Sequence, residues 1–231
     1  MVAGRTAAYP GTFDPPTVAH LAVAEAAWRQ GDLVRVDLVV SRNPLGKAPG
    51  VPSFEDRLTV LSEVAASRTW LGVRVTDRRL IAEVAAGYDA VIMGLDKWHQ
   101  VVDPAWYGGS VAARDAAVAA LPEVLLALRA GSPPPPSRPA SMRVLEVHED
   151  HLPVSSSLVR AGRSEWMVPE AARFDARTGA WTDPERYRRR SVLPGSTGSS
   201  GPAGSAPPAG TDRSAGTSLS PMPGRIDQPQ Q

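Results

Sequence analysis

The fold is decided by one stretch near the start of the chain, Tyr9-Pro10-Gly11-Thr12-Phe13-Asp14-Pro15-Pro16-Thr17-Val18-Ala19-His20. A short strand-like run, 6–9, leads into it, and apolar residues at helical spacing follow it, so it is predicted to join a first strand to a first helix. Glycine at position 11 has no Cβ to keep a ligand off the backbone, and the amides of Thr12 and Phe13 follow at the strand end. We expect an anion to bind there.

Thr17 and His20 are three positions apart where this helix begins. Side chains at that spacing lie on one face of a helix, and the positive end of the helix dipole lies beside them. The pair therefore indicates a phosphate clamp. A proline-rich turn with a histidine that merely packs at the helix start is the simpler interpretation of the same residues.

The rest of residues 1–190 alternates strand-like runs with helix-period segments, which is typical of a parallel sheet covered on both faces. Ser53 and Asp77 are expected to cap helices, and Gly87 to end one. The predicted fold is α/β, a Rossmann-like doubly wound parallel sheet of five or six strands, in which ligands bind at the carboxyl ends of the strands. Further strands are predicted at 34–40, 73–76, 90–93, 124–128 and 143–147, and helices at 18–30, 54–66, 78–86 and 111–120.

Composition excludes several kinds of chemistry and partner. The 231 residues contain no cysteine, which removes disulfide scaffolds, thiolate metal sites and a cysteine nucleophile. The 25 Lys+Arg and 24 Asp+Glu leave a formal net charge of +1, which argues against nucleic acid as a partner. Because no apolar run is long enough to span a bilayer, we expect no membrane partner and a cytoplasmic location.

The sequence predicts a single globular domain over residues 1–190, followed by a tail over residues 191–231. The tail includes eight Ser, seven Pro and seven Gly, with too few large apolar side chains to offset the entropy of ordering it, so we expect disorder. A second proline-rich stretch, 131–140, is interpreted as an extended loop inserted into the domain. The pair His148 and His151 is too weak a signal for zinc, and no metal held by protein side chains is predicted.

The first loop resembles a known family signature. The run from Gly11 to Pro15, followed by Thr17-Val18-Ala19-His20, looks like the (Thr/His)-x-Gly-His motif of the nucleotidyltransferase superfamily, which includes phosphopantetheine and nicotinate mononucleotide adenylyltransferases. The family glycine before the histidine is Ala19 here, which adds a methyl group close to the expected nucleotide. The resemblance implies that His20 and Thr17 hold the α-phosphate of ATP.

A second stretch, Val154-Ser155-Ser156-Ser157-Leu158-Val159-Arg160, resembles the family's Ile-Ser-Ser-Thr-x-Ile-Arg. Hydroxyls and free amides at a helix start can surround a phosphate, and an arginine one turn later adds a permanent cation. A serine-rich helix cap is the plainer interpretation. The resemblance implies that Ser155, Ser156 and Ser157 bind the nucleotide and that Arg160 holds the pyrophosphate that leaves.

A third element follows the second predicted strand, in the loop Asn43-Pro44-Leu45-Gly46-Lys47-Ala48-Pro49. The resemblance places a lysine in this loop to bridge the phosphates of acceptor and donor, a role that falls on Lys47. A lysine that is simply solvated on the surface is the alternative.

Two signals for the acceptor disagree. Gly94 and Asp96, followed by Trp106-Tyr107, resemble the Gly-x-Asp and Trp-Tyr of the nicotinate mononucleotide enzymes, in which an aspartate can bind ribose hydroxyls and a tryptophan can stack on a pyridine ring. Trp106 as a plain loop anchor is the alternative. The first loop and the triple serine lean instead toward the phosphopantetheine enzymes.

The implied reaction is adenylyl transfer, in which the acceptor phosphate attacks the α-phosphorus of ATP and pyrophosphate leaves, with Mg²⁺ bridging phosphates. The expected partners are ATP and a small-molecule phosphate acceptor, nicotinate mononucleotide-like, and a homo-oligomer is compatible with the sequence. Three alternatives stay open: a phosphopantetheine adenylyltransferase-like enzyme of coenzyme A synthesis, cytidylyl transfer to an alcohol phosphate, and a degenerate relative that binds nucleotide without turnover.

Overall fold

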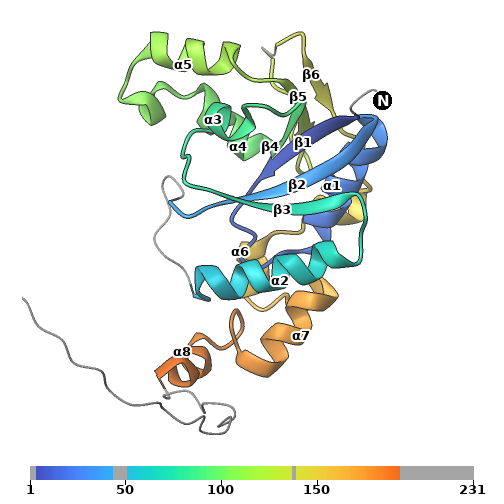
Figure 1. The fold of residues 1–231 in the computed structure, drawn as a ribbon, viewed down its shortest axis with the longest axis vertical. Coiled ribbons are helices and arrows are strands. Elements are labelled where there is room, and N and C mark those ends of the chain that lie inside the picture. The colour runs from blue at the N-terminus through green and yellow to red at the C-terminus, as the bar shows by residue number, and fades with distance from the viewer. Residues whose placement is uncertain (1–3, 44–50, 137–138, 193–231) are drawn as a thin grey trace, which may run out of the picture. The chain divides into compact units, whose positions relative to one another are not determined.

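Six parallel strands form one sheet in the order β3-β2-β1-β4-β5-β6. The computed structural model describes residues 4–43, 51–136 and 139–192 (Figure 1). The strand order reverses between β1 and β4, which is where Rossmann-like sheets bind their ligands, and the predicted fold class is confirmed. The strands are β1 (Arg5–Pro10), β2 (Leu33–Ser41), β3 (Leu71–Thr76), β4 (Ala90–Gly94), β5 (Glu123–Ala127) and β6 (Met142–Val144).

Helices cover both faces of this sheet. Figure 1 shows α3, α4 and α5 on one side and α2 and α7 on the other, and the buried side chains of α1 belong to the second layer. The α-helices are α1 (Val18–Gln30), α2 (Phe54–Ala66), α3 (Ile81–Ala85), α4 (Leu95–Val102), α5 (Val111–Ala119), α6 (Ser156–Arg160), α7 (Pro169–Thr178) and α8 (Pro184–Val192). Short 3-10 helices are η1 (Pro104–Tyr107), η2 (Glu149–His151) and η3 (Ser164–Trp166).

Buried side chains alternate along the central strands. In β1, Tyr9 packs in the layer of α1 and α2, whereas Ala8 packs against α3. In β4, Ile92 packs in the layer of α1 and α2, and Met93 packs in the layer of α4. Because both faces are covered, these strands are apolar at nearly every position, and this is the pattern from which they could be predicted.

The predicted bounds of α1 and α2 are those observed, and other elements differ. The hydroxyl of Ser53 caps α2 by accepting from the Asp56 N–H at 3.1 Å, as expected. The prediction for Asp77 was wrong, because α3 begins only at Ile81 and its N-cap is Leu80. The last strand is shorter than predicted, and α4 was not predicted as a helix at all.

The chain beyond α7 also departs from expectation. α8 extends to Val192, so the predicted tail cannot begin at 191, and the tail from 193 onward lies outside the described residues. The proline-rich stretch 131–140 connects β5 to β6 and has no helix or strand in the part that is described, 131–136 and 139–140. Among the described helices, none is long and apolar enough to cross a membrane.

Candidate functional site

The loop between β1 and α1 is held in place by contacts from distant parts of the chain. The Gly11 amide donates to the Val39 carbonyl at 3.1 Å, which prolongs the pairing of β1 with β2. Arg57 of α2 donates from Nη1 to the Thr12 carbonyl at 2.9 Å. Thr17, where the loop ends, forms an isolated antiparallel bridge with Met167, two residues before α7. The loop is therefore a fixed part of the molecule.

Phe13 explains why glycine stands at position 11. Its backbone is left-handed, with φ of 46°, and its buried ring packs edge-on against Tyr9 and His20, with centroids 5.5 and 5.1 Å apart. A Cβ on Gly11 would lie 2.7 Å from the Phe13 ring. We expected the missing Cβ to make room for a ligand, and the structure gives that space to a side chain of the protein. The Phe13 ring is therefore not available to a ligand.

Thr17 and His20 form a capping box at the start of α1. The Thr17 amide donates to His20 Nδ1 at 3.0 Å, Thr17 Oγ1 lies 2.8 Å from the same nitrogen, and the His20 amide donates to Oγ1 at 3.4 Å. Because a backbone N–H can only donate, Nδ1 is an acceptor and the neutral ring carries its proton on Nε2. The Thr17 side chain is completely buried. It is placed to orient the histidine, and the expectation that it reaches a phosphate itself does not fit this burial.

Burial also keeps the phenol of Tyr9, the residue that packs under this loop, in its neutral form. Desolvation raises the pKa of the Tyr9 phenol far above its ordinary value, against a smaller opposing effect of the Arg129 charge. The phenol therefore stays neutral at physiological pH, and it acts as an apolar support for the rings of Phe13 and His20.

The second sequence motif lies directly against this loop. Ser156 Oγ donates to the Pro15 carbonyl at 2.7 Å, across 141 positions of sequence. Arg160 donates from Nη1 to the Asp14 carbonyl, and the same nitrogen lies 3.8 Å from the Asp14 carboxylate. The two motifs, which stand at opposite ends of the α/β domain in sequence, thus form one continuous surface.

The three serines of that motif have different partners. The Ser155 hydroxyl caps α6 by accepting from the Leu158 N–H at 3.3 Å, and Ser156 is committed to the first loop. Ser157 is exposed and accepts from Arg160 Nη2 at 3.4 Å. Ser157 and Arg160 are therefore the members of the motif that lie at the surface beside the loop.

Gly94 is the last residue of β4, the strand that neighbours β1 at the reversal of strand order, and Asp96 follows it in the first turn of α4. A Cβ on Gly94 would meet nothing within 4 Å, so the space beside it is open. Asp96 forms an ion pair with Arg129, with 2.8 Å between Oδ2 and Nε, and both side chains are at least half exposed. Binding of a ribose by Asp96, as predicted, requires this exposed pair to open, which costs little in water.

Comparison with known proteins assigns the arrangement to a family. A family model described as cytidylyltransferase-like matches residues 8–162, which include the first loop and end two residues beyond the second motif. The chain belongs to the cytidylyltransferase-like family. The resemblance to the nucleotidyltransferase superfamily is thereby confirmed.

Two relatives are named adenylyltransferases. The phosphopantetheine adenylyltransferase of Corynebacterium diphtheriae is 34% identical over 97 residues, which are 39% of this chain and 56% of the relative, so the chain spans little more than half of that relative's length. The nicotinic acid mononucleotide adenylyltransferase of Plasmodium falciparum, solved with NaAD and with APC, matches with a TM-score of 0.54 at 12% identity, over 76% of this chain and 96% of that one. At that identity the structural match shows the fold alone.

Trp106, the predicted acceptor contact of this family member, is half-buried in η1. It lines a hollow of about 420 Å³ together with residues that follow the carboxyl end of β3, namely Asp77, Arg78, Arg79, Leu80 and Glu83. The structure thus places an aromatic face beside two arginines at the edge of the sheet where the family signature also lies. Lys47, the predicted phosphate bridge, lies outside the described residues.

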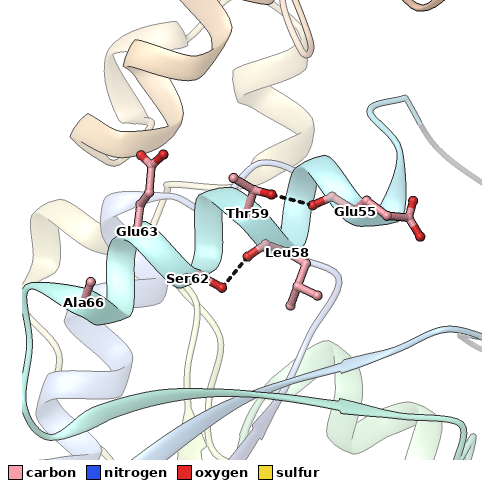
Figure 2. A pocket seen from close by; sticks show the side chains of 6 residues that line it. All are labelled: Glu55, Leu58, Thr59, Ser62, Glu63 and Ala66. Atoms are coloured by element: carbon pink, nitrogen blue, oxygen red, sulfur yellow. Dashed lines mark hydrogen bonds between the residues drawn. The ribbon is translucent and has the colours of Figure 1, made fainter. Parts of the chain in front are cut away.

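A larger hollow lies on the outer surface of α2 (Figure 2). Its volume is about 590 Å³, and the hydroxyls of Thr59 and Ser62 in its lining are bonded to carbonyls of their own helix. Its lining comes from α2 alone, and neither family motif contributes to it, so we do not assign it to the site. The residues that line it are Glu55, Leu58, Thr59, Ser62, Glu63 and Ala66.

Sequence reasoning missed two side chains that support the family loop. The guanidinium of Arg57 lies 5.7 Å from the centre of the Phe54 ring while it holds Thr12, and within the described part of the chain its Nε is buried without a hydrogen-bond partner. The indole of Trp181, beyond the family match, donates to Asp14. Neither residue stands in a motif or a periodic pattern, so no sequence signal could have singled them out.

Proposed function

We propose that the protein transfers AMP from ATP to the phosphate of a nicotinate mononucleotide-like acceptor and releases pyrophosphate. The observation that carries the proposal is the direct contact between α6 and the loop that leads to His20, through Ser156 and Arg160. A donor to one phosphate and a permanent cation for the next ones must lie side by side to serve one triphosphate. Family membership and the names of the two similar proteins support adenylyl transfer, although the two names carry different acceptors.

In this reaction an oxygen of the acceptor phosphate attacks the α-phosphorus of ATP in line. The new P–O bond forms as the bond from the α-phosphorus to the α–β bridging oxygen breaks, and the electron pair leaves with pyrophosphate. No covalent bond to the protein is needed, so the residues contribute position and charge. Mg²⁺ enters bound to the phosphates of ATP, as part of the substrate.

His20 is proposed to donate from Nε2 to an oxygen of the α-phosphate. The capping box with Thr17 holds Nδ1 as an acceptor, so the donor on Nε2 is oriented before the substrate arrives. A donor that need not reorganise stabilises the charge that builds up on the phosphate oxygens in the transition state.

Arg160 and Ser157 are proposed to hold the β- and γ-phosphates and then the pyrophosphate. Arginine stays charged at every physiological pH and presents several N–H groups in a planar fork, which suits phosphate oxygens. Lys47 is proposed to bridge acceptor and donor phosphates. Gly94 and the backbone of Thr12 and Phe13 are proposed to lie against the nucleotide.

The acceptor is proposed from the hollow at Trp106. An aromatic face beside Arg78 and Arg79 suits a flat pyridinium ring with a carboxylate substituent, as in nicotinate mononucleotide, because the ring can stack on Trp106 and the carboxylate can pair with an arginine. That acceptor would place the enzyme in NAD biosynthesis, for which we propose a cytoplasmic location. Phosphopantetheine is the second candidate, favoured by the 34% identity with a phosphopantetheine enzyme.

The deciding experiment supplies the full-length protein with each nucleoside triphosphate and either nicotinate mononucleotide or phosphopantetheine, and measures pyrophosphate. We expect release with ATP and nicotinate mononucleotide. Release with phosphopantetheine alone would assign the second acceptor, and release with CTP in preference to ATP would reject adenylyl transfer. Binding of ATP in a calorimeter, without pyrophosphate from any acceptor, would identify a relative that has lost turnover.

A further inference from the structure

The segment between α7 and α8 reaches back to the first loop, although it lies beyond the 8–162 family match. Trp181 in this segment is 1% exposed, and its indole Nε1–H donates to Asp14 Oδ1 at 2.7 Å. The contact spans 167 positions of sequence. Trp181 is buried, and its single hydrogen-bond donor binds the carboxylate of Asp14, a residue of the family motif. This contact connects the segment after α7 to the first loop.

Trp181 is itself fixed by the turn that carries it. Asp175 accepts from the Trp181 amide at 2.7 Å, and from the amide and hydroxyl of Thr182 at 3.1 and 2.5 Å. Gly179 ends α7 in a left-handed conformation, with φ of 74°. The indole is therefore presented to Asp14 from a rigid support.

α8 makes a second contact with the site region. The Tyr187 hydroxyl accepts from the Ser53 amide at 2.9 Å and donates to the Asp56 carboxylate, at the start of α2. α2 is the helix whose Arg57 holds the Thr12 carbonyl. The segment from α7 to α8, 169–192, thus fixes the first loop directly and α2 beside it; we name it the C-terminal clasp.

The hydrogen bond from the Trp181 indole limits which other groups the Asp14 carboxylate can bind. Oδ1 accepts from Trp181, and Oδ2 forms a long ion pair with Arg160 Nη1 at 3.8 Å, without a hydrogen bond between them. Arg160 donates instead to the neutral Asp14 carbonyl. If the indole donor were removed, the carboxylate would seek a replacement partner, and the nearest cation is Arg160. A hydrogen-bonded ion pair with Asp14 would then neutralise the Arg160 guanidinium, which is the cation proposed to bind the phosphates of ATP.

We propose that Trp181 is a positioning residue of the nucleotide site, which keeps the Asp14 carboxylate from forming a direct hydrogen bond with Arg160 and so leaves the N–H groups of that guanidinium available to phosphate. This inference rests on the proposed function, because it takes Arg160 to be the phosphate contact. It adds a requirement that the family motifs do not contain, namely that the C-terminal clasp be present for full affinity for ATP.

The test is Trp181→Phe in the full-length chain, which keeps a large ring and removes the N–H. We expect the dissociation constants of ATP and of pyrophosphate, measured by calorimetry, to rise about tenfold, while the KM of the acceptor changes less than twofold. The double variant Asp14→Asn, Trp181→Phe should recover most of the lost ATP affinity, because no carboxylate is left to pair with Arg160. A purely structural role for the indole would not give this recovery.

Trp70→Phe is the matched control. Trp70 stacks on Trp28 with 5.0 Å between ring centres, just before β3 and so at the amino edge of the sheet, and we expect its replacement to leave ATP affinity within twofold. An unchanged ATP affinity in Trp181→Phe, or a loss that the double variant does not recover, would overturn the positioning role while leaving the proposed function intact. A wild-type protein that binds neither ATP nor pyrophosphate would reject both.

Discussion

The proposed donor side and the proposed acceptor side of the candidate site are built differently. On the donor side, Thr17, Phe13 and Trp181 are buried and fully engaged with neighbours. On the acceptor side, Arg78 and Arg79 are exposed around the hollow at Trp106. Buried polar groups must keep their hydrogen bonds, so the donor side admits one arrangement, whereas exposed side chains exchange partners with water at small cost.

The largest effect is expected at His20, because its replacement removes the proposed hydrogen-bond donor to the α-phosphate. His20→Ala should lower the rate of pyrophosphate release by a factor of 100 or more, since one oriented donor contributes about 3 kcal/mol to the transition state. His148→Ala, at an exposed histidine outside the site, should leave the rate unchanged. A loss below tenfold in His20→Ala would contradict the assigned role.

Arg160 should matter next. Arg160→Ala is expected to weaken binding of pyrophosphate about thirtyfold, on the order of 2 kcal/mol for a charged hydrogen bond, as measured by calorimetry. Arg163→Ala is the matched control, because that exposed arginine pairs with Glu165 instead of with the first loop. Equal losses in both variants would mean that general surface charge, and not the position of Arg160, attracts the phosphates.

Substitutions at two glycines should have different effects, one on the stability of the protein and the other on binding of ATP. Gly11→Ala should lower the free energy of unfolding by about 2 kcal/mol, because the new methyl group meets the Phe13 ring in a packed core. Gly94→Ala, where the space is open, should change it by less than about 0.5 kcal/mol and raise the KM of ATP. Thermal and urea unfolding test the first part, and steady-state kinetics the second. If Gly11→Ala unfolds like wild type, Phe13 is not the reason for the glycine.

The smallest effect is expected on the acceptor side. Trp106→Ala should raise the KM of nicotinate mononucleotide about fivefold, as expected for loss of one stacking contact of about 1 kcal/mol, with the KM of ATP unchanged. Trp106→Phe should retain most of the affinity. A change confined to the KM of ATP would place this hollow on the donor side and remove the contrast between the two regions.

Where a pattern was local, it could be predicted from the sequence. The strands next to the site are apolar on both faces, and α1 and α2 carry periodic apolar residues, so both could be placed to within a residue or two. The two motifs were visible as residue strings. The roles of their members were less visible, because Thr17 and Ser156 turned out to be occupied by contacts within the protein. Whether a hydroxyl faces a ligand or a neighbouring loop depends on packing that no string of letters records.

The sequence by itself determined that this chain is an α/β domain, because hydrophobic periodicity is a property of neighbouring residues. The nucleotidyltransferase family was indicated by the resemblance of two short residue strings to the family signature. Only the tertiary structure decided that α6 lies against the first loop, that Phe13 occupies the space above Gly11, and that Trp181 holds Asp14. These contacts join residues far apart in sequence or turn on the direction of one ring, and both are set by the packing of the whole domain.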